Sequence, residues 1–106
     1  MNKETVLREL TELVAERERS QFHTSDNLAK SISIEAAELL ELFQWDDDPD
    51  QARVREELAD VLTYCYLLCS QNGFDPDEII LAKLKKTRSK YPVEKARGSS
   101  AKYDQL

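Results

Sequence analysis

The segment "SIEAAELLELFQW", residues 33–45, constrains the fold more than any other part of this chain. It is apolar on nearly every side of a helix, yet Glu35, Glu38 and Glu41 recur in it at a spacing of three. Removing a carboxylate from water is costly unless a partner compensates its charge. These glutamates therefore either face solvent or surround a cation.

The composition is that of one helical domain. The chain has 106 residues, of which 41% are hydrophobic and 34% charged, with only two glycines and three prolines. Such a composition argues against a disordered or all-β chain. No apolar run reaches the roughly 20 residues of a membrane span, and the N-terminus lacks the apolar segment of a signal peptide. We therefore expect a cytoplasmic protein.

The two cysteines, Cys65 and Cys69, lie four residues apart in an apolar helical pattern. This spacing on one helix does not suit a disulfide, and the chain has no set of cysteines and histidines for zinc. We expect both cysteines to be buried packing residues.

Charge is distributed unevenly along the chain. From residue 81 onward the net charge is +6, whereas the first 80 residues carry −12. A basic segment beside an acidic body suits a small polyanion that is bridged by a metal, rather than a nucleic-acid polymer. The alternative is a basic helix face in contact with solvent.

Apolar residues at helical spacing predict four helices. We expect Ser25 or Asp26 to cap the second helix and the segment "DDDPD" to end it. Gly73 is expected to end the third helix, and Pro76 is expected to begin the fourth. The expected ranges are residues 3–19, 27–45, 49–71 or 50–71, and 76–90, followed by an extended tail over residues 91–106.

The second and third predicted helices are apolar over more than one stripe. One short chain can hardly cover all of that surface. We therefore expect an all-α, four-helix bundle-like fold whose core is completed by homo-oligomerisation, as a homodimer or homotetramer.

Two pairs of carboxylates share the same helical spacing. Glu35 and Glu38 lie on one predicted helix, and Glu57 and Asp60 lie on the next. Residues three apart are neighbours on a helix surface, and a short connection favours an antiparallel pair of helices. The four carboxylates can then face one another.

Carboxylates that converge without lysine or arginine either take up protons or bind cations. Oxygen ligands suit magnesium, manganese or calcium, and magnesium usually also binds the phosphates of a substrate. The alternative is that the acidic residues form a solvated face, which is our expectation for Glu41 and Glu56. A calcium loop that starts at Asp46 is disfavoured, because Gln51 stands where such a loop needs glycine.

Five segments carry a resemblance to a known family: "QFHTSDNL", "EAAELLELFQW", "EELADVLTY", "KTRSKYP" and "ARGSSAKY". Together they resemble the MazG-like, all-α nucleoside triphosphate pyrophosphohydrolases, especially the dCTP pyrophosphatase branch, over about residues 16–103. The resemblance implies hydrolysis of a (deoxy)nucleoside triphosphate to the monophosphate and pyrophosphate. It also implies Mg²⁺, or Mn²⁺ in its place, as the cofactor.

The resemblance assigns roles to particular residues. Glu35, Glu38, Glu57 and Asp60 would bind the metal, with Glu38 and Glu35 as the catalytic pair and one glutamate accepting a proton from water. Residues expected to contact the nucleotide are Phe22, His23, Trp45, Tyr64, Lys83, Arg88, Arg97 and Lys102. As alternatives, Trp45 could pack at a helix end, Tyr64 in the core, and His23 could be an ordinary loop residue.

The chain departs from the dCTP pyrophosphatase pattern near the nucleotide. Arg19 stands in place of a tryptophan, "SDNL" in place of "PRNL", and Thr87 in place of an asparagine. These changes leave the preferred base and sugar open, but they do not touch the metal ligands. The alternative to an enzyme is a non-enzymatic helical interaction module with a solvated acidic face.

Overall fold

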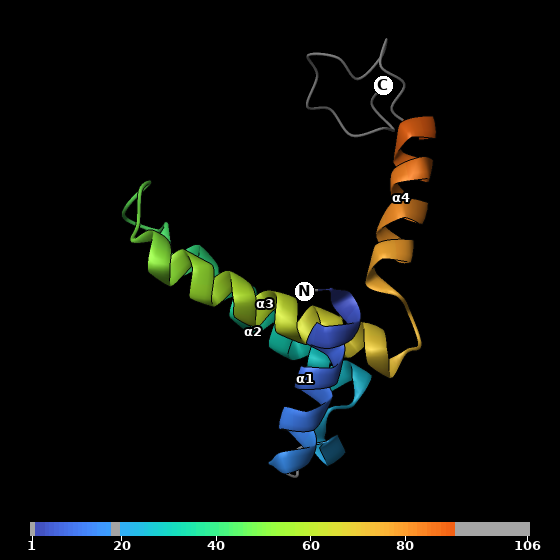
Figure 1. The fold of residues 1–106 in the computed structure, drawn as a ribbon. Coiled ribbons are helices and arrows are strands. Elements are labelled where there is room, and N and C mark those ends of the chain that lie inside the picture. The colour runs from blue at the N-terminus through green and yellow to red at the C-terminus, as the bar shows by residue number, and fades with distance from the viewer. Residues whose placement is uncertain (1, 18–19, 91–106) are drawn as a thin grey trace. The chain divides into compact units, whose positions relative to one another are not determined.

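The computed structural model describes residues 2–17 and 20–90, and all regular structure in these ranges is helical (Figure 1). The all-α prediction is therefore confirmed for the described ranges, and the predicted tail at 91–106 lies outside them. The elements are α1 (Lys3–Glu16), a short 3-10 helix η1 (Ser20–Phe22), α2 (Ser25–Leu42), α3 (Gln51–Gln71) and α4 (Pro76–Lys90).

The predicted cap of α2 was wrong by one residue. The hydroxyl oxygen of Thr24 accepts a hydrogen bond from the Asn27 N–H at 3.3 Å, and the same hydroxyl donates to Asp26 Oδ1 at 2.6 Å. Thr24 is thus the N-cap, while Ser25 and Asp26 already belong to the first turn. A threonine that directly precedes the helix satisfies an otherwise unpaired N–H group as well as serine or aspartate would.

Two helices end earlier than their apolar patterns predict. α1 ends at Glu16 instead of residue 19, and α2 ends at Leu42 instead of Trp45. At the end of α2 the N–H groups of Phe43 and Gln44 bond to carbonyls three residues back, at 3.0 and 3.2 Å. This tightening ends the α-helix and leaves Trp45 in the following loop.

α2 and α3 form an antiparallel hairpin, as predicted. Residues 43–50 join one end of the pair, and Asp50 caps α3 by accepting the Ala52 N–H at 3.0 Å. At the other end, Asn72 Nδ2 donates to Ser25 Oγ at 3.2 Å and to the Leu68 carbonyl at 2.9 Å. α1 packs against α3 (Figure 1). The hairpin therefore places the middle of α2 beside the middle of α3.

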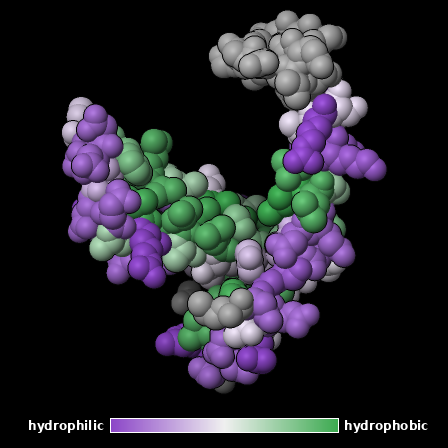
Figure 2. Space-filling view, turned by 45° about the horizontal axis from the view of Figure 1, so that its top comes forward, coloured by the Kyte–Doolittle hydropathy of each residue, from purple (hydrophilic) through white to green (hydrophobic). Residues whose placement is uncertain are grey.

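The chain buries little apolar surface by itself. Among the described residues, Leu28 is the one large hydrophobic side chain that is fully buried, at 1% exposed. Several others on α2 and α3 remain open to solvent, including Leu40, which is 69% exposed, and Leu62, which is 51% exposed. Figure 2 shows apolar surface along this part of the molecule. Such exposure is unusual for a monomer.

The chain divides into two units, Met1–Gly73 and Phe74–Leu106. Gly73 follows α3 with a φ of 70°, a conformation that favours glycine, so its predicted role at this helix end is confirmed. In the second unit, Asp75 Oδ1 accepts the N–H groups of Asp77 at 2.9 Å and Glu78 at 3.2 Å. This cap and the buried Pro76 start α4 at the predicted residue.

None of the described helices combines the length and the hydropathy needed to cross a membrane.

Candidate functional site

Three carboxylates meet where α2 and α3 lie side by side. One oxygen each from Glu35, Glu57 and Asp60 lies within 4.8 Å of the others. We call these three residues the carboxylate cluster. Glu35 projects from α2 while Glu57 and Asp60, three residues apart, project from α3, so the antiparallel hairpin brings the cluster together.

Glu38, the fourth predicted ligand, lies beside the cluster rather than in this closest group. It forms a side-chain hydrogen bond with Glu35, and its charge also acts on Glu57. Its side chain is exposed, whereas those of Glu35 and Glu57 are partly buried. The structure thus brings all four predicted carboxylates into one neighbourhood and places Glu38 on its open side.

The carboxylate cluster contains unpartnered oxygens and carboxyl groups with raised pKa values. The Oε2 atoms of Glu35 and Glu57 are buried, and neither has a hydrogen-bond partner. The hydrogen bond with Glu38, followed by burial and by repulsion from Glu38, Asp60 and Glu57, raises the pKa of Glu35 from its ordinary 4.5 to about 7. Burial, and then the charges of Glu38 and Asp60, also raise the pKa of Glu57, against the opposing effect of Arg53.

Such a site has the chemistry of a cation site. Unpaired, partly buried carboxylate oxygens that converge from two helices are hard ligands, which magnesium, manganese and calcium prefer. A divalent ion would supply the partner that both Oε2 atoms lack. The donor set therefore fits a divalent cation.

Two hollows adjoin the carboxylates. The larger, about 760 Å³, takes in Glu38 and Glu57 and is called here the tryptophan hollow. Its lining residues are Glu38, Glu41, Leu42, Gln44, Trp45, Asp46, Pro49, Asp50, Arg53 and Glu57.

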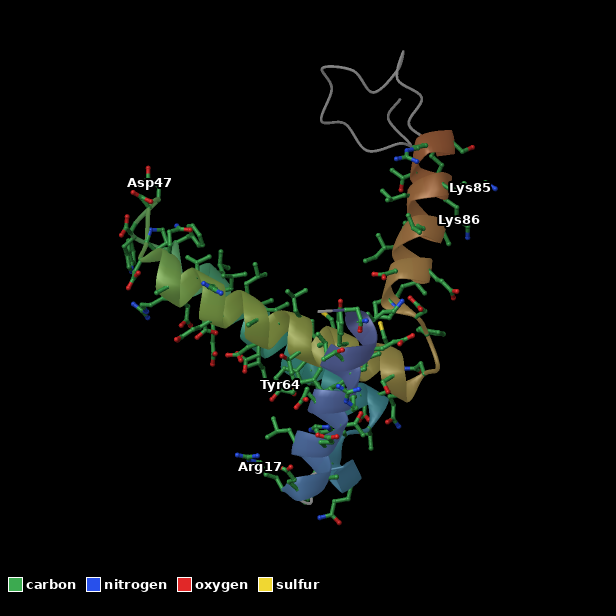
Figure 3. All side chains as sticks on the ribbon, in the orientation of Figure 1. Arg17, Asp47, Tyr64, Lys85 and Lys86 are labelled. Carbon is green, nitrogen blue, oxygen red and sulfur yellow. The ribbon has the colours of Figure 1, made fainter. Side chains whose placement is uncertain are left out.

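The smaller hollow, about 340 Å³, takes in Glu35 and Asp60 and is called the tyrosine hollow. Its lining residues are Leu10, Leu13, Val14, Arg17, His23, Glu35, Asp60, Thr63, Tyr64 and Leu67. Figure 3 labels Tyr64 on α3 and Arg17 near the C-terminal end of α1.

Three of the predicted nucleotide contacts line these hollows. Trp45 is 88% exposed in the tryptophan hollow, so it does not pack at a helix end in the described part of the chain. His23 and the partly buried Tyr64 line the tyrosine hollow. An aromatic face can stack on a base, and a histidine or hydroxyl can bond to base or sugar.

The other predicted contacts are one residue of the first unit and four residues of the second. Phe22 is 60% exposed in η1, where its carbonyl accepts a hydrogen bond from Asn27 Nδ2 at 3.0 Å, and it lines neither hollow. Lys83 and Arg88 belong to α4 in the second unit. Arg97 and Lys102 lie outside the described residues.

Sequence reasoning missed two arginines, Arg17 in the tyrosine hollow and Arg53 in the tryptophan hollow. A signal existed for Arg53, which precedes Glu57 by four residues and therefore shares its face of α3. Arg17 had no such signal, because its position depends on how α1 packs against the hairpin.

The fold and the site together define an all-helical protein whose helical hairpin carries a carboxylate cluster suited to divalent cations. A profile of the MazG-like family matches residues 30–106, and the chain belongs to this family. The resemblance found in the sequence is therefore confirmed.

Individual relatives agree with this assignment. The chain is 37% identical to dCTP pyrophosphatase 1 of Bos taurus, over 97% of this chain and 67% of that protein, and 38% identical to dCTP pyrophosphatase 1 of Homo sapiens, over 97% and 66%. It thus spans about two thirds of their length. A crystal structure of a pyrophosphatase from Archaeoglobus fulgidus superposes with a TM-score of 0.79 at 42% identity, over 84% of this chain and 91% of that one.

Proposed function

We propose that this protein is a Mg²⁺-dependent enzyme that hydrolyses (deoxy)nucleoside triphosphates to the monophosphate and pyrophosphate. One observation carries the proposal: a carboxylate cluster with two buried, unpartnered oxygens lies beside two hollows that contain aromatic and basic side chains. The names of the curated relatives and of the structural neighbour support a pyrophosphohydrolase.

The carboxylates are proposed to divide between two tasks. Glu35, Glu57 and Asp60 would hold Mg²⁺, with Glu38 as the predicted fourth ligand. When bound, the ion lowers the pKa of water and stabilises negative charge on the phosphates. Glu38, on the open side of the cluster, is placed to accept the proton of the water that attacks the α-phosphorus, and pyrophosphate leaves with the electrons of the broken P–O bond.

The substrate is proposed to be dCTP or a related deoxynucleotide, because the curated relatives are named dCTP pyrophosphatases. His23 and Tyr64, which line the tyrosine hollow, are candidates to contact base and sugar, and Trp45, which is exposed in the tryptophan hollow, is a candidate to contact another part of the nucleotide. The further predicted contacts stay as predictions: Phe22, Lys83, Arg88, Arg97 and Lys102.

A homodimer or homotetramer is proposed to complete the core. Leu40 and Leu62 are more than half exposed although they belong to the two helices that carry the site. A second copy that covers such surface would remove it from water. The reaction is proposed to take place in the cytoplasm, as the sequence predicts.

The proposal is tested by incubating the purified protein with a panel of dNTPs and NTPs, with and without Mg²⁺. We expect pyrophosphate and the monophosphate as products, in equal amounts and only with the metal. Nucleoside diphosphates and (p)ppGpp extend the panel to other phosphoanhydrides. If no nucleotide is hydrolysed, the proposed enzymatic activity is rejected, and the alternative of an interaction module with a solvated acidic face is favoured.

A further inference from the structure

Arg53 stands out among the residues around the tryptophan hollow. Of the described residues that line it, Arg53 alone is positively charged, whereas five are carboxylates: Glu38, Glu41, Asp46, Asp50 and Glu57. Arg53 lies one helical turn before Glu57 on α3 and acts on that residue's charge. Its guanidinium makes no hydrogen bond or ion pair with any residue in the ranges 2–17 and 20–90. Its guanidinium donors are therefore available to a ligand.

The two hollows offer different chemistry to the two ends of a nucleotide. The tyrosine hollow combines apolar side chains such as Leu13 and Leu67 with His23 and Tyr64, which suits a base and a sugar. The tryptophan hollow is open and rich in carboxylates, so a phosphate chain that enters it needs positive charge. Arg53 is the protein's own source of that charge among the described lining residues.

We propose that Arg53 binds the β- and γ-phosphates of the substrate, the part that leaves as pyrophosphate. This inference rests on the proposed function, because it assumes a triphosphate whose α-phosphate lies at the carboxylate cluster. The base then lies toward the tyrosine hollow and the phosphate chain toward the tryptophan hollow. An arginine suits this task because its planar fork donates two parallel hydrogen bonds to phosphate oxygens.

The test measures binding of each product separately, so it does not depend on turnover. Inorganic pyrophosphate and dCMP are titrated by calorimetry, in Mg²⁺, into the wild type, Arg53→Ala, Arg53→Lys, Arg17→Ala and the control Arg55→Ala. Arg55 is an exposed arginine of α3 that lines neither hollow. Circular dichroism checks the fold, and Arg53→Gln replaces the alanine variant if its spectrum changes.

We expect Arg53→Ala to weaken pyrophosphate binding roughly 10- to 100-fold, the usual effect of losing hydrogen bonds to a charged group, while dCMP binding stays within about twofold of the wild type. Arg53→Lys should recover part of the loss, because it keeps the charge and loses the fork. Arg55→Ala should bind both products as the wild type does.

Four results would overturn the inference. Pyrophosphate binding could be equally strong in Arg53→Ala and Arg55→Ala, or absent from the wild type. Arg53→Ala could weaken dCMP binding instead, which would put the base in the tryptophan hollow. Arg17→Ala, in the tyrosine hollow, could instead be the variant that loses pyrophosphate binding. That result would reverse the orientation of the substrate between the two hollows. Failure of the wild type to hydrolyse any nucleotide would reject the proposed function separately.

Discussion

Replacing Glu35 by glutamine should stabilise the metal-free protein at pH 8. Glu35 is partly buried, one of its oxygens has no hydrogen-bond partner, and its pKa is raised from 4.5 to about 7. Above pH 7 the folded chain therefore keeps an ionised carboxylate that is less favourable there than in the unfolded chain. Glutamine has nearly the same shape and no charge, so it removes the repulsion.

The magnitude follows from the pKa. Each unit of difference between the unfolded and folded pKa is worth about 1.4 kcal/mol, so the rise from 4.5 to about 7 sets an upper bound of roughly 3.5 kcal/mol. Solvent screening of a partly exposed group and the sharing of protons with Glu38 reduce this bound. We expect Glu35→Gln to raise the free energy of unfolding by roughly 1 kcal/mol at pH 8.

The pH dependence has a definite sign. Between pH 4.5 and 7 the folded Glu35 binds more protons than the unfolded one, so the wild type loses stability as the pH rises through this window. The difference between Glu35→Gln and the wild type should therefore grow from pH 5 to pH 8. Below pH 4.5 both states are protonated, and this contribution to the difference vanishes.

Urea unfolding followed by circular dichroism measures both effects, in EDTA and at one protein concentration, because subunit association also contributes to stability. Glu56→Gln, a change at an exposed residue of α3, is the control and should stay within about 0.5 kcal/mol of the wild type. Mg²⁺ should stabilise the wild type more than Glu35→Gln. A variant that is less stable than the wild type at pH 8 without metal would refute the reasoning.

Three further outcomes are expected. Glu38→Gln should lower kcat at least roughly 100-fold, as expected for loss of a general base, with an unchanged circular dichroism spectrum; retained activity would move the base elsewhere. Tyr64→Ala should raise KM for dCTP roughly 10-fold through the lost contact with base or sugar, and Tyr64→Phe should restore most of it; an unchanged KM would exclude this contact. Leu62→Glu should shift the protein to a smaller species in light scattering after gel filtration, because Leu62 is 51% exposed on a site helix; an unchanged mass would place the subunit interface elsewhere.

Local signals in the sequence predicted most helix boundaries. The start of α4 at Pro76 and the end of α3 near Gly73 depend on residues within one turn, and both match the structure. The cap of α2 was misplaced because Thr24, Ser25 and Asp26 are all good cap residues, and the hydrogen bond from Thr24 to Asp26 decides among them. The end of α2 before Trp45 depends on a tightened last turn that apolar periodicity does not reveal.

The sequence by itself predicted that this chain is helical and that Glu35, Glu38, Glu57 and Asp60 can face one another, because helical spacing and a short connection act over neighbouring residues. Only the tertiary structure decided that Glu38 lies on the open side, that two oxygens are buried without partners, and that Arg17 and Arg53 line opposite hollows. Those features depend on how α1, α2 and α3 rotate and pack against one another. Packing joins residues that are far apart in the chain, so no local pattern encodes it.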